Sequence, residues 1–495
     1  MSWINKTGSR SSICQSVFSR SVSVVLGLLI VTGCAAVGPN YSPPKLEVPE
    51  QWHGVSGSGQ KLDVKMLAQW WKALDDPVLT GLIDQAVAEN LDIKEAESRV
   101  REARFRRLKS RAALFPTLDT TASARKSGTR EDGGSATESE LYAAGFDAGW
   151  ELDLFGGVRR SVEASQADLE AGVEDLHDVM VTLLSEVAVN YIDLRTYQAR
   201  LAVAEKNVSS QKETWELLRV LSEAGMGDEL AVAQARYNLE SSQATIPGLE
   251  AGLEAAANRL AVLVGRPAGS LQGELADVRP VPTVSIKLAV GVPADVIRQR
   301  PDIRQAEREL AAQTSRIGEA EADLYPQFTL NGSIGLEALS FGDLFSSSNR
   351  IWSIGPSLRW PVFDAGAVRS NIKIQTELQQ QALIRYKAVV LSALEEVENA
   401  LTAYAKEQQK LGMLQTAADS AQSAVKLAGQ RYATGMIGFS DVLDAQRSLL
   451  SFEDQLAQSR GVVLSDLVQL YKALGGGWQC LTGAAAPNRA QTDKG

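Results

Sequence analysis

The chain has 495 residues, a formal net charge of -10, two histidines and three cysteines. The modest, interspersed negative charge argues against a nucleic-acid partner. Of the three cysteines, Cys14 would be removed with the N-terminal signal, Cys34 would be acylated and Cys480 would remain alone, so no disulfide framework is possible within one chain. The histidines, His53 and His177, lie far from any cysteine in the sequence, and the chain has no phosphate-binding P-loop. We therefore expect no enzyme, no metal site and no cofactor. The one exception is a covalent lipid, which the N-terminal sequence predicts.

The N-terminus is predicted to be an export signal. Basic residues precede an apolar run from 22 to 31, which is too short to span a bilayer as a helix. This pattern is typical of a secretory signal peptide, here residues 1–33. The sequence Val31-Thr32-Gly33-Cys34 resembles a bacterial lipobox, so Cys34 is predicted to become the mature N-terminus and to carry an N-acyl diacylglycerol lipid. The alternative is an ordinary signal peptide with an incidental cysteine.

The mature chain contains a long internal duplication. Leu114-Phe115-Pro116 returns as Leu324-Tyr325-Pro326, and Ala224-Gly225-Met226 returns as Thr434-Gly435-Met436, in each case 210 residues later. Solenoid repeats have periods of roughly 20 to 50 residues, so this period indicates a duplicated half-protein. We divide the mature chain into an N-terminal spacer, a first repeat, a second repeat and a disordered tail, at residues 34–66, 67–275, 276–478 and 479–495.

Each repeat contains two segments in which apolar and polar residues alternate, as between Tyr142 and Leu154. They predict four strands, at about 116–125, 141–154, 326–337 and 350–362. Segments of about ten residues with one apolar face suit strands that cross an outer membrane, although half-buried strands of a soluble sandwich alternate equally well. No second long apolar run exists, so any membrane crossing falls to these strands. Four strands cannot close a barrel, and closure would require several protomers.

Long stretches without proline follow the second and fourth predicted strands, from Val158 to about Ser222 and from Ala367 to Gly435. About 65 residues of helix would extend roughly 100 Å. These predicted helices have small apolar residues on their flanks and one polar face. That pattern favours helices that form the wall of a water-filled cylinder. A cytosolic coiled-coil rod is the alternative.

Several short motifs then occur in a characteristic order: Gln69-Trp70-Trp71-Lys72, Arg298-Gln299-Arg300-Pro301-Asp302, Arg359-Trp360-Pro361-Val362-Phe363-Asp364-Ala365-Gly366 and Gly475-Gly476-Gly477-Trp478. Over nearly all of its mature length the chain resembles the TolC-like outer-membrane efflux proteins, most closely their lipoprotein branch, the NodT type, which serves resistance-nodulation-division pumps. The resemblance implies a mainly α protein with a membrane β-barrel. This would be a homotrimeric α-barrel/β-barrel channel, with four strands and long helices in each duplicated protomer.

The same resemblance implies the function and the partners. The protein would be the outer-membrane channel of a tripartite efflux system, carrying drugs or other small molecules from the periplasm to the exterior. It would be lipid-anchored in the outer membrane, with a large periplasmic part. Its partners would be outer-membrane lipid, a periplasmic adaptor (membrane fusion) protein and an inner-membrane resistance-nodulation-division transporter. The alternatives are the channel of a type I secretion system and a passive porin-like lipoprotein.

The resemblance also assigns roles at the periplasmic end. The glycine turns at Gly225-Met226 and Gly435-Met436 would be hairpin tips that dock the adaptor. In the family, aspartates just after the second turn form rings that narrow the closed pore, which points to Asp441 and Asp444. The plainer interpretation is helix capping, with Ser440 as the N-cap and Asp441 favoured by the positive end of the helix.

One position departs from the family. Some relatives carry an arginine at the position of Ile437, where it bonds across to the neighbouring hairpin and holds the pore shut. Isoleucine cannot do this, so closure of the constriction would depend on packing of Ile437, Phe439 and Tyr432.

Overall fold

The computed structural model of the chain describes residues 36–45, 48–49, 51–53, 67–129, 137–282 and 298–479. The predicted signal peptide, the predicted lipidation site Cys34, most of the spacer and the tail after Gln479 lie outside the described residues. The chain divides into two compact units. Unit 1 is formed within residues 1–45, 100–172 and 306–386, and unit 2 within residues 46–99, 173–305 and 387–495. Each unit therefore draws on both sequence repeats.

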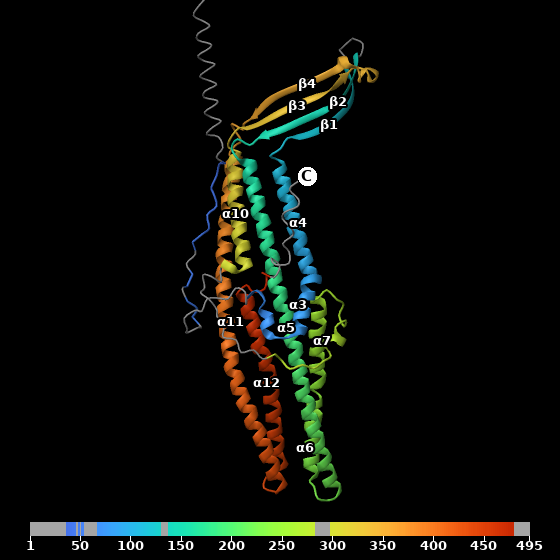
Figure 1. Cartoon of the computed structure of the whole chain (residues 1–495), viewed down its shortest axis with the longest axis vertical. Coiled ribbons are helices and arrows are strands. Elements are labelled where there is room, and N and C mark those ends of the chain that lie inside the picture. Colours follow the sequence, from blue (N-terminus) through green and yellow to red (C-terminus); the bar gives the residue numbers. More distant parts are fainter. Residues whose placement is uncertain are drawn as a thin grey trace, which may run out of the picture. The chain divides into compact units, whose positions relative to one another are not determined.

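The elements follow one another in nearly the same order in the two repeats (Figure 1). The first repeat contains η1 (Trp70–Leu74), α3 (Pro77–Glu89), α4 (Leu91–Ala112), β1 (Thr117–Thr129), β2 (Thr137–Leu152), α5 (Gly157–Glu223), α6 (Glu229–Gln243), α7 (Ile246–Leu263) and α8 (Gln272–Leu275). The second contains α10 (Pro301–Ala322), β3 (Gln327–Ala338), η2 (Phe341–Asp343), η3 (Ser347–Asn349), β4 (Arg350–Arg359), α11 (Ala367–Ala433) and α12 (Phe439–Ala473).

The four strands and the two very long helices predicted from the sequence are confirmed, and α5 and α11 each contain 67 residues. The hairpin end of β1 and β2 and the end of β4 differ from the prediction by three or four residues. The β1–β2 hairpin continues to the pair Thr129 and Thr137 through polar residues that an apolar alternation does not mark. Strand β4 ends at Arg359, shortly before Pro361, which cannot donate a backbone hydrogen bond to a ladder. Among the described residues, no helix combines the length and the apolar character needed to cross a membrane.

The strands of unit 1 form one antiparallel sheet in the order β1-β2-β3-β4 (Figure 1). The register places Phe146, Ile334 and Trp352 side by side across three strands, and their exposed fractions are 51%, 63% and 75%. On the opposite face, the hydroxyls of Ser333 and Ser353 share a hydrogen bond of 2.8 Å. The sheet therefore has one apolar face that is open to its surroundings and one hydrogen-bonded polar face.

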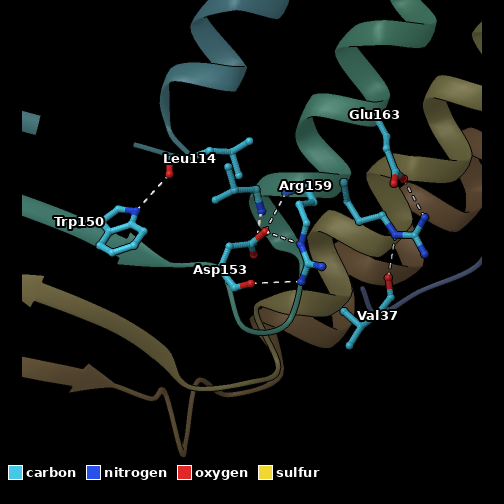
Figure 2. A network of polar contacts seen from close by, with 8 residues as sticks. Val37, Leu114, Trp150, Asp153, Arg159 and Glu163 are labelled. Carbon is cyan, nitrogen blue, oxygen red and sulfur yellow. Dashed lines mark hydrogen bonds and ion pairs between the residues drawn. The ribbon is translucent and has the colours of Figure 1, made fainter. Parts of the chain in front are cut away.

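Two equivalent tryptophans mark the junction between the sheet and the helices of unit 1. The Trp150 indole N–H donates to the carbonyl of Leu114 at 3.1 Å, and the Trp360 indole N–H donates to the carbonyl of Leu324 at 3.1 Å. Figure 2 shows the first of these bonds. The duplication therefore repeats this contact at the corresponding ends of β2 and β4.

A carboxylate starts each long helix at the same junction. The Asp153 carboxylate accepts the backbone N–H groups of Val158 and Arg159 at 3.3 and 3.0 Å, and the Arg159 side chain donates to it as well, at 3.1 Å (Figure 2). In the second repeat the Asp364 carboxylate accepts the backbone N–H of Val368 at 2.7 Å. Negative charge at a helix N-terminus is favourable, because the first N–H groups have no partner within the helix.

The main hydrophobic core lies in unit 2 and is built around aromatic residues of the N-terminal motif. Trp70 is 1% exposed and stacks on Tyr471, with ring centroids 5.4 Å apart. The Asp76 carboxylate caps α3 by accepting the Val78 backbone N–H at 2.8 Å, and it also accepts the Tyr191 hydroxyl at 2.5 Å. These contacts fix η1 and α3 against α5 and α12.

The half-buried carboxyl of Asp178 in unit 2 makes stability depend on pH. Burial, followed by the nearby negative charge of Asp302, raises its pKa to about 6, although Arg300 and Lys472 act against this and Asp175 adds to it. A carboxyl whose folded-state pKa is raised binds more protons in the folded state. Stability is therefore lost as the pH rises from about 4, the unfolded value, through about 6, and the loss persists above that.

Replacing Asp178 by asparagine is expected to stabilise unit 2 at pH 7 by about 1 kcal/mol, since the full shift would correspond to roughly 3 kcal/mol and solvent screening reduces it. The gain should become small near pH 4, where the wild-type carboxyl is protonated in the folded state and about half protonated in the unfolded state. Thermal unfolding of the two proteins between pH 4 and 8 measures this. A gain that is the same at every pH would show that burial of the Asp178 charge is not its cause.

Candidate functional site

The first helical hairpin of unit 2 turns between α5 and α6. Gly225 has a φ of 73°, and its backbone N–H donates to the carbonyl of Ser222 at 2.9 Å. The next N–H, that of Met226, reaches back to the carbonyl of Leu221 at 2.9 Å. This pair of bonds is the Schellman motif, in which a glycine with positive φ ends a helix. Asp228 then caps α6 by accepting the Leu230 backbone N–H at 2.9 Å.

The second hairpin, between α11 and α12, ends in the same way. Gly435 has a φ of 75° and donates to the carbonyl of Tyr432 at 2.9 Å, and Met436 donates to the carbonyl of Arg431 at 2.9 Å. The methionines after the two glycines are highly exposed apolar side chains, with Met226 74% exposed and Met436 73% exposed. Each turn therefore presents a thioether, a side chain that adapts readily to partner surfaces.

Asp441 acts as a capping residue of α12. The helix begins at Phe439, with Gly438 as its N-cap, so the expectation that Ser440 is the N-cap was wrong. The Asp441 carboxylate accepts the Gly438 backbone N–H at 3.2 Å, which satisfies a donor just before the helix. Asp441 remains exposed at the surface, so this role is compatible with a further one in the pore, which stays a prediction.

Asp444 lies one turn further along α12, on the same face as Asp441. Its side chain is 76% exposed, and its carboxylate lies 3.6 Å from the guanidinium of Arg447. An exposed ion pair of this kind contributes little to stability. The arginine does, however, place positive charge beside one of the two carboxylates predicted to form the rings.

Arg447 joins the two hairpins within one protomer. Its guanidinium lies over the ring of Tyr237 on α6, 5.2 Å from the ring centroid, and also donates to the Tyr237 hydroxyl. A further bond of 3.1 Å goes to the side-chain oxygen of Asn238, a residue that is only 4% exposed. We call this set of contacts between Arg447, Tyr237 and Asn238 the hairpin clasp.

A small apolar core lies between the hairpins, next to the clasp. Phe439 is 6% exposed, and its ring centroid lies 5.4 Å from that of the half-buried Tyr432. The other members of the core come from both hairpins; they are Leu218, Ala231, Ala235, Val442 and Leu443. Phe439 and Tyr432 therefore pack inside one protomer, and Ile437 beside them is half-buried. Their predicted role in narrowing the pore stays a prediction.

Sequence reasoning missed the clasp entirely. Arg447 follows Asp444 by three residues and could have been noticed as its ion-pair partner on a helix. Tyr237 and Asn238 lie about 210 residues away in the other repeat, and no local pattern links them to Arg447.

Comparisons with known proteins agree with the fold and with the duplication. The family model described as outer membrane efflux protein matches residues 82–266 and again 292–476. Nodulation protein T of Rhizobium leguminosarum bv. trifolii is 35% identical over 454 residues, which is 90% of this chain and 94% of the relative. The solvent efflux pump outer membrane protein SrpC of Pseudomonas putida is 31% identical, over 92% of this chain and 97% of the relative. Among solved structures, the outer-membrane channel OprN matches with a TM-score of 0.84 and 37% identity, over 90% of this chain and 100% of that one.

Proposed function

The chain belongs to the outer membrane efflux protein family and is the outer-membrane channel of an efflux system, and from this premise we propose that three copies assemble into one conducting pore. The observation that carries this proposal is the open four-stranded sheet. Among the described residues, its outer strands, β1 and β4, each have a neighbouring strand on one side only. Unpaired backbone groups at such edges are very costly in hydrocarbon.

Closure by neighbouring protomers satisfies these edges. Two copies would supply eight strands, which enclose a space filled by side chains, whereas three supply twelve and leave room for water. The apolar row of Phe146, Ile334 and Trp352 would then face lipid, and the polar row with Ser333 and Ser353 would face the lumen. A lumen lined by hydroxyls suits a channel that passes solutes and does no chemistry on them.

The hairpin turns of unit 2 are the proposed periplasmic end. The exposed Met226 and Met436 would contact a periplasmic adaptor protein, which would in turn connect the channel to an inner-membrane transporter of the resistance-nodulation-division class. Cys34 is proposed to carry the N-acyl diacylglycerol lipid, because the lipobox and the preceding apolar run are features of a lipoprotein signal. Two acyl chains are enough to anchor a protein stably in a membrane, whereas a single chain anchors it only marginally.

Asp441 and Asp444 are proposed to form the charged constriction, with six carboxylates around a threefold axis. The test is the double variant Asp441→Asn with Asp444→Asn in planar bilayers. We expect the ratio of cation to anion permeability to fall by a factor of about two or more, because the carboxylate field attracts cations. Asp419→Asn, which removes an exposed carboxylate from α11 far from the turn, is the control and should leave the ratio unchanged. If the double variant keeps the wild-type ratio, capping is the whole role of Asp441.

A further inference from the structure

The segment that follows the predicted lipidation site is held tightly in unit 1. The Arg160 side chain of α5 donates to the carbonyl of Val37 at 2.9 Å, to the carbonyl of Gly38 at 3.2 Å and to the side-chain oxygen of Asn40 at 2.9 Å. Its remaining nitrogen bonds Glu163 at 2.8 Å, and the residue is only 5% exposed. Figure 2 shows the bond to Val37 together with Glu163. A buried arginine that directs two of its three nitrogens at one short segment, and is held in place through the third by Glu163, is a built docking site for that segment.

Glycines on both sides make room for this segment. A Cβ on Gly156, just before α5, would lie 2.5 Å from the Cβ of Ala36. A Cβ on Gly318 of α10 would lie 2.8 Å from the carbonyl oxygen of Val37. The Val37 backbone N–H also donates to the carbonyl of Phe155 at 3.0 Å. Residues 36–38 therefore occupy the space that side chains at positions 156 and 318 would fill.

Three residues further on, Tyr41 extends the contact along α10. Its hydroxyl donates to Glu307 at 3.0 Å, and the Arg308 guanidinium lies 5.5 Å from its ring centroid. The ring packs against the small residues Ala311 and Ala312. Residues 36–41 thus form a continuous latch on unit 1, and we use that name for them below.

An exposed apolar surface lies beside the start of the latch. The Phe155 ring, next to the carbonyl that binds Val37, stacks on the Tyr325 ring with centroids 4.6 Å apart. Leu324 precedes Tyr325 and accepts the indole N–H of Trp360 at 3.1 Å. Leu154, Leu324, Tyr325 and Trp360 are between 39% and 53% exposed. These four residues together with Phe155 are the junction patch.

We propose that the junction patch is the binding surface for the acyl chains of Cys34, and that Arg160 is the positioning residue that keeps the acylated end of the chain beside it. The inference rests on the lipidation proposed above. Cys34 precedes Ala36 by two residues, so covalent geometry limits the separation of their Cα atoms to about 7 Å. The chain therefore delivers its own lipid to an apolar surface of the required character, at the level where tryptophans mark a membrane interface. Bilayer phospholipid at the same surface is the competing occupant that the experiment separates.

The experiment uses the full-length chain, produced in cells that are fed a photoactivatable fatty acid and irradiated in intact outer membranes. Mass spectrometry first establishes the mass of the mature N-terminal peptide and then locates the crosslinks from its acyl chains. We expect most of them in the two peptides that contain Leu154-Phe155 and Leu324-Tyr325. Crosslinks from phospholipid are recognised because they carry no N-terminal peptide.

Two variants test the latch, and one serves as the control. Arg160→Ala removes its donors, and Gly318→Ala fills its groove while favouring the helix. In both, crosslinks at the junction patch should fall at least about fivefold, and hydrogen exchange of residues 36–41 should rise about tenfold or more. Arg316→Ala, which removes an arginine of α10 whose side chain bonds Asp168 and Gln313, should change neither.

The possible outcomes distinguish this inference from the lipidation proposal on which it rests. If the N-terminus is acylated but its crosslinks are spread over the strands, the lipidation proposal is supported and the assignment of the junction patch is wrong. Unchanged exchange and crosslinks in Arg160→Ala would overturn the role of the arginine. An N-terminus without lipid would overturn both the lipidation and the inference, while the conductance of the channel would still report separately on the pore.

Discussion

Arginine in place of Ile334 is expected to prevent the chain from assembling in the outer membrane, whereas arginine in place of the adjacent Ser333 should be tolerated. Ile334 lies in the middle of β3, between Phe146 and Trp352 on neighbouring strands, and is 63% exposed. In the proposed trimer this row faces hydrocarbon near the middle of the bilayer. An arginine there costs about 2–4 kcal/mol per site, which the threefold assembly repeats three times.

The matched control uses the alternation of the strand itself. Ser333 is the preceding residue of β3, and its hydroxyl bonds that of Ser353 at 2.8 Å on the opposite face. Arginine at this position would extend into a water-filled lumen, at the cost of one exposed hydrogen bond. Trp360→Arg should give an intermediate result of about 0–1 kcal/mol, because Trp360 lies just beyond the end of β4 and would be at the membrane interface in the proposed trimer.

The amount of trimer in outer-membrane fractions, measured by light scattering after detergent extraction, distinguishes these variants. We expect a severe loss for Ile334→Arg, a small loss for Trp360→Arg and wild-type yield for Ser333→Arg. If Ser333→Arg abolished assembly and Ile334→Arg did not, the two faces of the sheet would be assigned the wrong way round. Equal and full assembly of both would mean that the sheet does not lie in a membrane.

The sequence was informative wherever a short period or a single residue type controls the backbone. Alternation identifies the strands and their faces, because every second side chain of a strand lies on the same side. Absence of proline allowed the two 67-residue helices to be predicted. Gly225 and Gly435 end α5 and α11, because both have positive φ, which glycine adopts at little cost.

Contacts between distant segments could not be obtained in this way. The latch joins Arg160 to Val37, and the clasp joins Arg447 to Tyr237, pairs separated by 123 and 210 residues. An arginine on a helix surface has the same local pattern whether it faces water or a partner. The N-cap of α12 was misplaced for a more local reason, since serine is a common N-cap and the return bond from Asp441 to Gly438 is visible only in three dimensions.

The clasp changes how closure of the pore is explained. Ile437 cannot form the ionic bond that an arginine forms at that position in some relatives, and packing around Phe439 was the expected substitute. The structure adds Arg447, which links α12 to α6 through the Tyr237 ring and through Asn238. Within one protomer, the second hairpin is therefore fastened to the first by a cation as well as by an apolar core.

Replacing Arg447 by alanine is expected to separate the two hairpin ends and to raise the conductance of the resting channel. The change removes a charged hydrogen bond and a cation–π contact, and it leaves the side-chain oxygen of the buried Asn238 without this donor. We expect the free energy that attaches α12 to α6 to fall by about 2–3 kcal/mol. It also frees the Asp444 carboxylate from its neighbouring cation. Selectivity for cations should therefore rise, opposite in sign to the effect of removing the carboxylates.

Spin labels at Met226 and Met436, introduced as cysteines with Cys480 replaced by serine, measure the separation of the two turns directly. In Arg447→Ala their distance distribution should lengthen and broaden, single-channel conductance should increase, and cells should become sensitive to large antibiotics. Arg447→Lys should restore little, because an ammonium cannot reproduce the planar contacts of the guanidinium. Arg236→Ala, which removes an arginine of α6 that pairs only with Glu240 along the same helix in the described structure, is the matched control and should match wild type. If Arg447→Ala leaves both the distances and the conductance as they were, the apolar core around Phe439 holds the hairpins together without the clasp.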